Sequence, residues 1–480
     1  MTTPTNALAW LASNEPASLA RLTDWLKIPS VSTDPAYKAE TARAADWAAD
    51  HLRQSGLRVE ILPTGDPAGT GHPIVLAESD AAPDYAGPHV LFYGHYDVQP
   101  ADPLELWDSP PFEPVIKPAQ GPVGERIVAR GAVDDKGQVA CFLEALRAWK
   151  ETTDQTAGGV RFTVLLEGEE ESGSVNLDRF VRQNADRLGK CDVCVISDTG
   201  MLDRGKPAIT YGVRGLAYTE VILHGADRDL HSGMWGGRGP NPISELIKVL
   251  AQLWDADRHV TIPNFYDGVR TITDAERAEW DALNFDQTAA LKEIGLGPDA
   301  DIGEAGFSPL EREWARPTAE INGIVGGYTG KGAKTVIPSH ASAKVSFRLV
   351  DDQDPEKIAE SFFEFCRKRT PPGCRWEFLN HGGGDPATVA TDSPTLAAAR
   401  NALKSAANGT EAALIKTGGS IPVAGMLKKE LGLETIFMGF GLADDRVHSP
   451  NEKFELDCFR LGARAHVLLI DELRRMNSRS

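Results

Sequence analysis

The first candidate for chemistry is the motif GHYDVQP (residues 94–100), which directly follows the apolar run Val90–Tyr93. In an open α/β sheet, ligand-binding groups gather at the carboxyl ends of the strands, so His95 stands where a site is built. An imidazole that binds a metal needs a hydrogen-bond acceptor at its other ring nitrogen, and Asp97 offers one. The motif therefore indicates a metal ligand, and the alternative is a histidine that is hydrogen-bonded within a turn.

Acidic side chains gather at three further places that border predicted strands or helices. Asp134 and Asp135 precede the stretch 136–150, and two adjacent carboxylates exceed what a helix cap requires. The segment 167–171 holds four glutamates within five positions. Their mutual repulsion leaves two interpretations, solvated surface or a divalent-metal site. Asp198 ends another apolar run, so its position also favours a metal site.

Two imidazoles and three carboxylates from these motifs suffice for two metal ions. The set comprises His95, Asp134, one glutamate of the acidic cluster, Asp198 and His448. If one carboxylate bridges, each ion receives one histidine and one terminal carboxylate, and positions stay open for water. Two ions roughly 3.5–4 Å apart bind and activate a bridging water, so the residues predict a dinuclear hydrolytic site.

The elements that must position these residues alternate between helices and strands. Apolar spacing predicts helices over residues 1–27, 38–56 and 136–150, and strands over 73–77, 89–93, 160–166 and 193–197. This alternation is typical of an α/β sheet, so the first part of the chain is expected to be one layered α/β domain.

The pattern changes after Gly215 and returns later in the chain. The intervening order is strand, helix, strand, strand, helix, strand, at 216–223, 242–254, near Ile321, 341–350, 355–369 and 375–379. This order is that of a split βαβ domain of two layers. The stretch 255–319 is too long for a bare loop and is expected to carry short helices. Helices at 394–406, 421–431 and 453–475, with a strand at 435–438, resume the α/β pattern, so the small domain is inserted.

Composition narrows the partners and the compartment. The 480 residues suggest two or three domains and carry 50 Lys and Arg against 69 Asp and Glu, a net charge of −19, which disfavours nucleic acid. No apolar run is long enough for a membrane span, and the amino terminus lacks an export pattern. Six scattered cysteines fit a cytoplasmic protein with reduced thiols, and Cys191 and Cys194 are expected to be buried core thiols.

Taken together, the motifs resemble the dinuclear zinc aminopeptidase-like metallopeptidase family, in particular its carnosinase and cytosolic nonspecific dipeptidase branch. Other relatives are aminoacylase, succinyl-diaminopimelate desuccinylase and glutamate carboxypeptidase. The motifs are GHYDVQP, RGAVDDKG, EGEEESGS, VISD, ITYGVRG, DLHSG, AKTVIP, GGSIPV and VHSPNEKF, in family order from about residue 94 to 454. The resemblance implies a zinc-peptidase-like α/β catalytic domain, residues 1–213 and 387–480, with an inserted ferredoxin-like α+β lid and dimerisation domain, residues 214–386.

The resemblance also assigns the metal ligands. One zinc would be bound by His95 and Asp198, the other by Glu171 and His448, with Asp134 as the bridge. Family members carry a cis peptide after the bridging residue, here between Asp134 and Asp135.

Three further acidic residues receive different roles. The family pattern makes Glu170 the general base, and Asp97 would orient His95. Glu169 stands where the pattern varies, so it is expected to be solvated surface.

Substrate contacts are implied at five further positions. In the resembling dipeptidases the histidine equivalent to His231 comes from the partner subunit and stabilises the oxyanion, which predicts a homodimer through the lid domain. Arg348 resembles the clamp for the substrate carboxylate, and Thr335, Ser420 and Gly419 resemble further contacts. Without the resemblance, His231 reads as a turn histidine and Arg348 as a solvated side chain.

We therefore predict a cytoplasmic metallopeptidase that hydrolyses dipeptides and binds two divalent ions per subunit, Zn2+, with Mn2+ or Co2+ as alternatives. No nucleic acid or membrane is expected as a partner. The closest alternative is an N-acyl amino acid deacylase of the same family, and a further one is a catalytically silent metal-binding protein. The sequence does not specify the preferred dipeptide, the native metal, the dimer geometry or the roles of His224 and His381.

Overall fold

The computed structural model describes residues 4–65, 70–419 and 421–476, which form two compact units. The first takes the residues up to Tyr211, Val389–Ile415 and the residues from Leu427 onward, and the second takes Gly212–Thr388 and Lys416–Met426. The predicted domains differ mainly in placing 416–426 with the catalytic part. The roles of the two units as catalytic domain and lid stay predictions at this point.

A mixed β-sheet forms the centre of the first unit. Its strand order is β1 (Arg58–Leu62), β2 (Ile74–Glu78), β6 (Phe162–Glu167), β3 (Val90–His95), β7 (Val193–Ile196), β17 (Glu434–Phe437) and β8 (Ala208–Val213). The four strands from β6 to β17 are parallel, whereas β1 and β2 run antiparallel at one edge. All residues of β3, β6 and β7 are buried, as expected for parallel strands covered on both faces.

The register of the parallel strands brings three of the predicted motifs together. His95 pairs with Glu167, the last residue of β6, and Tyr93 pairs with Ile196, the last residue of β7. The acidic cluster and Asp198 follow these two ends directly. The carboxyl edge of the sheet is therefore the place where the predicted site is assembled.

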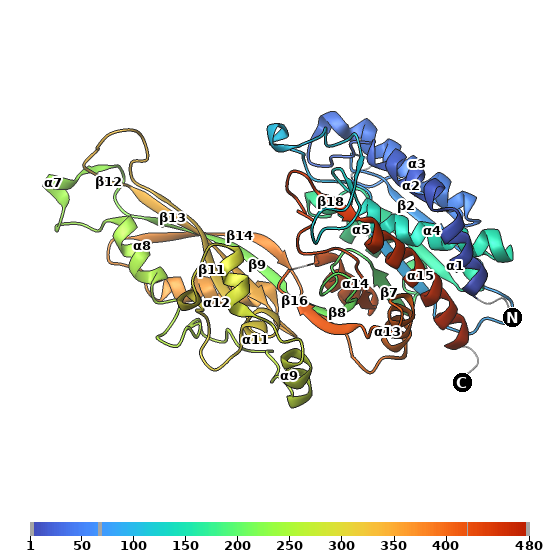
Figure 1. Cartoon of the computed structure of the whole chain (residues 1–480). Coiled ribbons are helices and arrows are strands. Elements are labelled where there is room, and N and C mark those ends of the chain that lie inside the picture. The colour runs from blue at the N-terminus through green and yellow to red at the C-terminus, as the bar shows by residue number, and fades with distance from the viewer. Residues whose placement is uncertain (1–3, 66–69, 420, 477–480) are drawn as a thin grey trace. The chain divides into compact units, whose positions relative to one another are not determined.

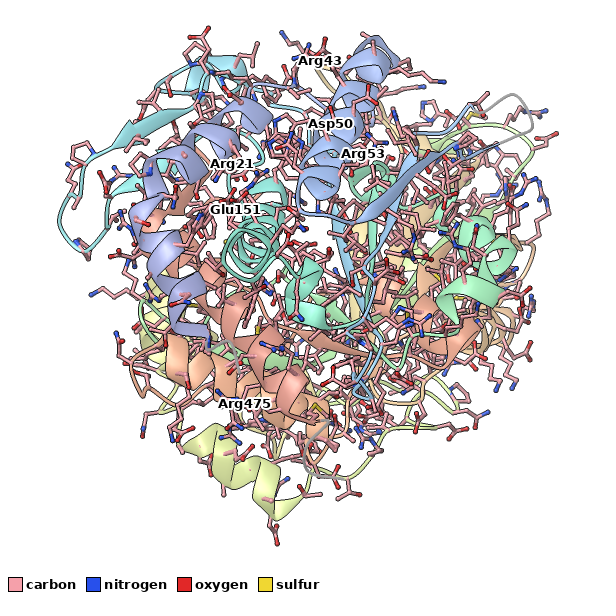
Figure 2. The ribbon with its side chains drawn as sticks, turned by 90° about the vertical axis from the view of Figure 1, so that its right-hand side faces the viewer. Arg21, Arg43, Asp50, Arg53, Glu151 and Arg475 are labelled. Carbon is pink, nitrogen blue, oxygen red and sulfur yellow. The ribbon has the colours of Figure 1, made fainter. Side chains whose placement is uncertain are left out.

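Helices cover the sheet of the first unit, and α4 and α15 pack against each other (Figure 1). The set is α1 (Pro4–Ser13), α2 (Glu15–Leu26), α3 (Lys38–Gln54), α4 (Lys136–Thr153), α5 (Leu177–Gln183), α6 (Ala185–Leu188), α13 (Pro394–Ala406) and α15 (Leu456–Met476). In α3, Arg43, Asp50 and Arg53 are exposed on the outer side (Figure 2), while Leu52 and four alanines are buried: Ala44, Ala45, Ala48 and Ala49. This amphipathic pattern explains why the segment forms a surface helix.

The single helix predicted over residues 1–27 was wrong, because the chain forms two helices that meet at Asn14. Pro16 occupies the first turn of α2. A proline lacks the backbone N–H that a helix interior needs, but it is tolerated in a first turn. The proline therefore marks the start of a new helix.

A small sheet joins two segments that are distant in the sequence. Its strands are β18 (Lys453–Glu455), β5 (Arg126–Val128) and β4 (Val115–Lys117), in that order. The helix predicted to begin at Lys453 begins only at Leu456, because the preceding three residues pair with β5. This pairing brings the segment before Asp134 next to the segment after His448.

The second unit is built on a four-stranded antiparallel sheet. The order is β11 (Thr318–Gly326), β13 (His340–Leu349), β9 (Gly215–His224) and β14 (Arg375–Gly384). Along β9 and β13, buried residues alternate with less buried ones, so one face contacts the core. Helices α8 (Pro242–Leu250) and α12 (Pro355–Arg367) pack on this sheet (Figure 1). The predicted ferredoxin-like order is confirmed.

Shorter elements complete the second unit and the segments where the chain changes from one unit to the other. The stretch 255–319 carries the predicted short helices, which include α9 (Asp274–Asp281), α10 (Gln287–Glu293) and α11 (Pro309–Trp314). The other elements are β10 (Leu230–His231), α7 (Ser232–Trp235), β12 (Val336–Ile337), β15 (Ala387–Thr388), β16 (Ala413–Thr417) and α14 (Pro422–Leu431). Helices α9 and α11 begin with capping boxes, Thr273 with Glu276 and Ser308 with Glu311.

Candidate metal centre

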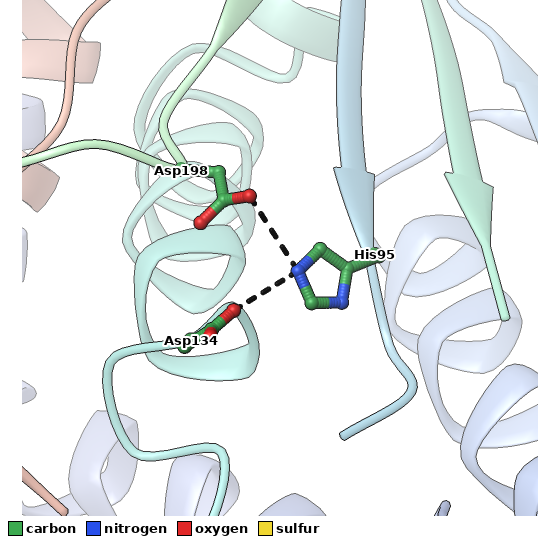
Figure 3. A group of neighbouring side chains, drawn as sticks. All are labelled: His95, Asp134 and Asp198. Carbon is green, nitrogen blue, oxygen red and sulfur yellow. Dashed lines mark ion pairs between the residues drawn. The ribbon is translucent and has the colours of Figure 1, made fainter. Parts of the chain in front are cut away.

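His95 ends β3 and is completely buried. Its Nδ1 lies 3.1 Å from the carbonyl oxygen of Asp97, and a carbonyl can only accept, so Nδ1 carries the proton. Nε2 lies 3.1 Å from Oδ1 of Asp134 and 3.6 Å from Oδ2 of Asp198 (Figure 3). The ring is thus oriented with Nε2 toward two carboxylates, which is the arrangement of a metal-binding histidine.

Asp134 lies between the two histidines. While Oδ1 faces His95, Oδ2 lies 2.9 Å from Nε2 of His448. The peptide bond between Asp134 and Asp135 is cis, as predicted. Because each oxygen of Asp134 faces a different histidine, this carboxylate has the geometry that a bridging ligand needs.

The second group of possible ligands contains Glu171 and His448. Nε2 of His448 lies 3.2 Å from Oε2 of Glu171, and Gln99 donates a hydrogen bond of 2.7 Å to the same oxygen. Two sets of side chains therefore converge and share Asp134: His95, Asp134 and Asp198, and Asp134, Glu171 and His448.

The donor set fits divalent metal ions. Nε2 of His95 and Oε1 of Glu171 are buried, and neither forms a hydrogen bond within the described part of the chain. Buried polar atoms normally have such a partner, so these two atoms are available to a cation. Neutral imidazoles and carboxylates are the ligands that Zn2+ binds in catalytic sites.

Asp97 connects three of the predicted site residues. Its buried carboxylate accepts hydrogen bonds from the backbone amides of Glu170 (3.3 Å) and Glu171 (3.0 Å), and its Oδ1 lies 3.4 Å from Nδ1 of His95. The amides belong to a short 3₁₀ turn, Glu170–Ser172. Asp97 therefore orients the histidine and also fixes the start of the acidic loop.

The electrostatics around Glu170 suit a proton acceptor. Burial raises the pKa of its carboxyl group to about 8, and the negative charges of Asp198 and Glu171 act in the same direction, against His95. A carboxyl group whose pKa lies near the operating pH can both take up a proton and return it, which is what a catalytic proton-transfer group requires.

The pKa of Asp134 and the pKa of His448 are shifted in opposite directions. Hydrogen bonds to Asp134 and Glu171 raise the pKa of His448 to about 10. Burial opposes ionisation of Asp134, but the adjacent His448 and His95 rings outweigh burial and lower its pKa. Burial is the main reason why the pKa of Glu171 is raised. The cluster is thus a concentrated anionic site that favours positive charge.

Glu169 corrects one prediction, because it is buried and not solvated. Its carboxylate accepts hydrogen bonds from the backbone amides of His72 (2.8 Å) and Asn176 (3.1 Å) and from the Asn176 side chain. These bonds close the acidic loop at its base, so Glu169 has a structural role there.

Two of the predicted substrate residues lie side by side in the second unit. His231 in β10 pairs with Val336 in β12, and Ser232 N donates to the carbonyl oxygen of Thr335 at 3.1 Å. Both His231 and Thr335 are exposed. Nδ1 of His231 accepts a hydrogen bond of 3.0 Å from Gly233 N, so a neutral ring carries its proton on Nε2.

Arg348 and Gly419 belong to another part of the second unit. Arg348 in β13 lines a cavity of about 550 Å³ together with Arg214. Arg214 donates from its backbone to Gly419 O (3.1 Å) and from Nε to Gly418 O (3.0 Å). Ser420 lies outside the described residues. His224 and His381 pair with carboxylates in the same unit and belong to neither metal group.

Sequence reasoning did not identify Gln99, Asp135 or Glu452 as part of the site. Gln99 contacts Glu171, Oδ2 of Asp135 accepts from His95 N at 3.2 Å, and Glu452 accepts from Asp134 N at 3.2 Å. All three lie in the sequence motifs of the predicted ligands. Gln99 and Glu452 each lie four residues after a proposed ligand, and Asp135 directly follows one. That proximity was the available signal.

Two groups of possible metal ligands that share Asp134, at the carboxyl edge of the parallel strands, are typical of a metallohydrolase. The model of peptidase family M20/M25/M40 matches residues 91–472, and the chain belongs to this family. Members use divalent metal ions, and the chain is a hydrolase that acts on peptide bonds.

Similar proteins include named dipeptidases. The Cys-Gly metallodipeptidase DUG1 of Candida albicans is 33% identical over 94% of both chains, and the human Beta-Ala-His dipeptidase is 32% identical over 90% of this chain and 85% of its own. Among solved structures, the dipeptidase Dug1p of Saccharomyces cerevisiae has a TM-score of 0.80 at 29% identity, covering 98% of this chain and 99% of that one. Human carnosine dipeptidase 1 has a TM-score of 0.77 at 29% identity, covering 99% of each.

Two further predictions concern the rest of the chain. All six cysteines are free thiols, and Cys191 and Cys194 are buried, as predicted. Within the described ranges, none of the helices combines the length and the apolar character that a membrane crossing demands.

Proposed function

We propose that this chain is a dipeptidase whose first unit is the catalytic domain and holds two zinc ions. One ion would be bound by His95 and Asp198, the other by Glu171 and His448, with Asp134 between them. The observation that carries this proposal is the pair of ligand groups joined through the two oxygens of Asp134. Two divalent ions in such a site supply Lewis-acid chemistry, polarising a carbonyl and lowering the pKa of water.

Glu170 acts as the general base in this proposal. It would take a proton from the attacking water and return it to the amine that leaves, so that one carboxylate serves both steps. Two observations support this role: its raised pKa, and the hydrogen bonds that the backbone amides of Glu170 and Glu171 donate to the Asp97 carboxylate. Asp97 would keep His95 and this turn in register.

His231 of a second subunit is proposed to stabilise the oxyanion. In the single chain His231 is exposed, and its Nδ1 accepts from Gly233 N, so the Nε2–H of the neutral ring is the group that can donate. Preorganised donors of this type contribute strongly to acyl-transfer catalysis.

The homodimer itself is supported by the surface of the second unit, which we propose as the lid and dimerisation domain. β11 is an edge strand, and Ile324 and Val325 near its end are 49% and 64% exposed. Met234 and Trp235, next to His231, are 63% and 41% exposed. Exposed apolar residues and an unpaired strand edge favour a surface that another chain covers.

The substrate is proposed to be a dipeptide with a free carboxylate. Arg348 would bind that carboxylate, because a planar guanidinium offers two parallel donors to it. Thr335, Gly419 and Ser420 would make further contacts. The names of the similar proteins favour dipeptides over N-acyl amino acids.

A substrate panel tests the proposal. The protein is stripped with a chelator, reloaded with Zn2+, Mn2+ or Co2+, and assayed on Cys-Gly, β-Ala-His, other dipeptides and N-acetyl amino acids. We expect hydrolysis of dipeptides and none in the stripped sample. Cleavage of the N-acyl compounds alone would establish the deacylase, and a metal-loaded sample inert on the whole panel would establish a silent metal-binding protein.

We also propose a cytoplasmic location. Six free thiols, five of them buried, suit a reducing compartment. Fractionation of the native cells would test this directly.

A further inference from the structure

A buried carboxylate beneath the metal centre, that of Glu452, is surrounded by hydrogen-bond donors. Oε2 accepts from Arg130 Nη1 (2.7 Å) and Gly131 N (3.1 Å), and Oε1 accepts from Val133 N (3.0 Å) and Asp134 N (3.2 Å). The side chain of Glu452 is 0% exposed. Four donors converge on two oxygens, so the carboxylate is fully satisfied within the protein.

All of these donors come from one short segment, residues 130–134. The backbone carbonyl of Glu452 adds a further contact, because it accepts from Ala129 N at 3.1 Å. Arg130 is anchored on its other side by a bond of 3.1 Å from Nη2 to Pro100 O. One residue therefore fixes the path of the chain up to the amide of Asp134.

Glu452 also belongs to the segment that carries His448. It lies four residues beyond His448 and directly before β18, which pairs with β5. The two segments that it joins supply Asp134, shared by both ligand groups, and His448. A displacement of either segment would change the distance of 2.9 Å between Oδ2 of Asp134 and Nε2 of His448.

We propose that Glu452 is a positioning residue of the metal centre, which holds Asp134 and His448 at the separation that two ions require. This inference rests on the proposed metal centre but concerns metal affinity rather than substrate. Groups that orient metal ligands in this way typically contribute about 10- to 100-fold to metal affinity.

A matched control exists in the same unit. Glu144 in α4 is also buried and is also paired with an arginine, accepting from Arg21 Nε (2.7 Å) and Nη2 (2.6 Å) and from Ser18 Oγ (2.6 Å). Arg21 lies on α2 (Figure 2), and none of these three residues belongs to a ligand group. Loss of the Glu144 charge disturbs a buried ion pair whose partners, Ser18 and Arg21, lie on α2 and not in the segment 130–134.

The experiment compares Glu452→Gln with Glu144→Gln. The amide nitrogen of glutamine cannot accept, so each variant leaves buried donors without a partner and loses stability. Zn2+ affinity is measured by competition with a chelating indicator, the Co2+ absorption spectrum reports the ligand geometry, and urea unfolding of the metal-free proteins reports stability.

We expect both variants to unfold at lower urea concentration, but only Glu452→Gln to lose Zn2+ affinity, by about 10- to 100-fold for both ions, and to shift the Co2+ bands. Unchanged affinity and spectrum in Glu452→Gln would overturn the inference. If that variant does not fold, Glu452→Asp, which keeps the charge but withdraws it by one methylene, must show a smaller loss of affinity, and wild-type affinity would overturn the inference. Wild-type protein that binds no metal would instead contradict the proposed function.

Discussion

The proposed metal ligands and the proposed substrate contacts are built in opposite ways. His95, Asp97 and Asp134 are buried; Nδ1 of His95 is bonded to the carbonyl oxygen of Asp97, and the Asp97 carboxylate accepts from two backbone amides of the first unit. In the second unit, His231 and Thr335 are exposed. His231 belongs to the short strand pair β10–β12, which has two residue pairs, and Thr335 directly precedes β12. One group is preorganised by its own chain, and the other presents its functional atoms outward.

This difference indicates which part of the reaction depends on another molecule. Ligands held in place by buried hydrogen bonds bind a cation with little reorganisation. Exposed side chains lose conformational freedom only when a substrate or a second subunit contacts them. The comparison therefore predicts that changes in the first unit affect metal or chemistry, whereas changes in the second affect assembly and substrate binding.

The largest effect is expected at Glu170, the proposed proton acceptor. Glu170→Ala should retain both ions and lose about 100- to 10,000-fold in kcat, because the water would lack its base. Elemental analysis and kcat on the best dipeptide measure the two quantities. Asp178→Ala, which removes an exposed carboxylate in α5, is the control and should behave as wild type. Substantial residual hydrolysis by Glu170→Ala would exclude its assignment as the base.

His231 tests whether the second unit acts on a neighbouring subunit. His231→Ala should keep its metal and fold and lose about 100- to 1000-fold in turnover, the usual effect of removing one oxyanion donor. His224→Ala, on β9, is the control. Mixing inactive Glu170→Ala and His231→Ala proteins should restore activity, because a hybrid dimer contains one site with both groups intact. Mixtures no more active than their components would count against the contribution from the partner.

Arg348 should affect substrate binding more than the chemical step. Arg348→Lys loses the bidentate contact, and a hydrogen bond to a charged group contributes about 1.5–3 kcal/mol. KM for dipeptides should therefore rise about 10- to 100-fold with little change in kcat. Arg316→Lys, in the same cavity but bound to Glu304 at 2.6 Å, is the matched control. An unchanged KM in Arg348→Lys would place the carboxylate elsewhere.

The last prediction concerns stability and not activity, in the core of the first unit, where His466 is buried with Nε2 3.0 Å from Ser197 Oγ. Burial lowers the pKa of His466 to about 3, from 6.5 in the unfolded chain. The unfolded state therefore binds more protons between these values, so this contribution to stability is present above pH 6.5 and is lost as the pH falls toward 3. This pH-dependent contribution of His466 to the free energy of unfolding is on the order of a few kcal/mol.

Urea unfolding of metal-free wild type and His466→Gln across this range isolates the effect. The variant should show a weaker decline of stability with falling pH than the wild type. Parallel declines would mean that His466 is not kept neutral by the fold.

Three of the proposed ligands could be located from the sequence because of sheet geometry. His95, the acidic cluster and Asp198 follow apolar runs, and the ends of β3, β6 and β7 meet at one edge; the choice of Glu171 within the cluster rested on the resemblance. Asp134 and His448 come from segments outside this sheet; their residue types included them in the predicted set, and the resemblance assigned the bridge and the second ion to them.

Other features could not be predicted because they depend on tertiary contacts. Glu169 is buried and accepts hydrogen bonds from His72 and Asn176, but no local sequence pattern distinguishes it from a solvated glutamate. The same holds for Glu452, whose donors are more than 300 positions away in the sequence, with separations from 318 to 322 residues. A long-range contact of this kind has no signal in composition or spacing.

The most direct test of the account is anomalous diffraction at the zinc edge from crystals of the zinc-loaded protein. We predict two peaks in the first unit, one beside His95 and Asp198 and one beside Glu171 and His448, with Asp134 between them. A single peak, or peaks that none of these five side chains contacts, would contradict the account.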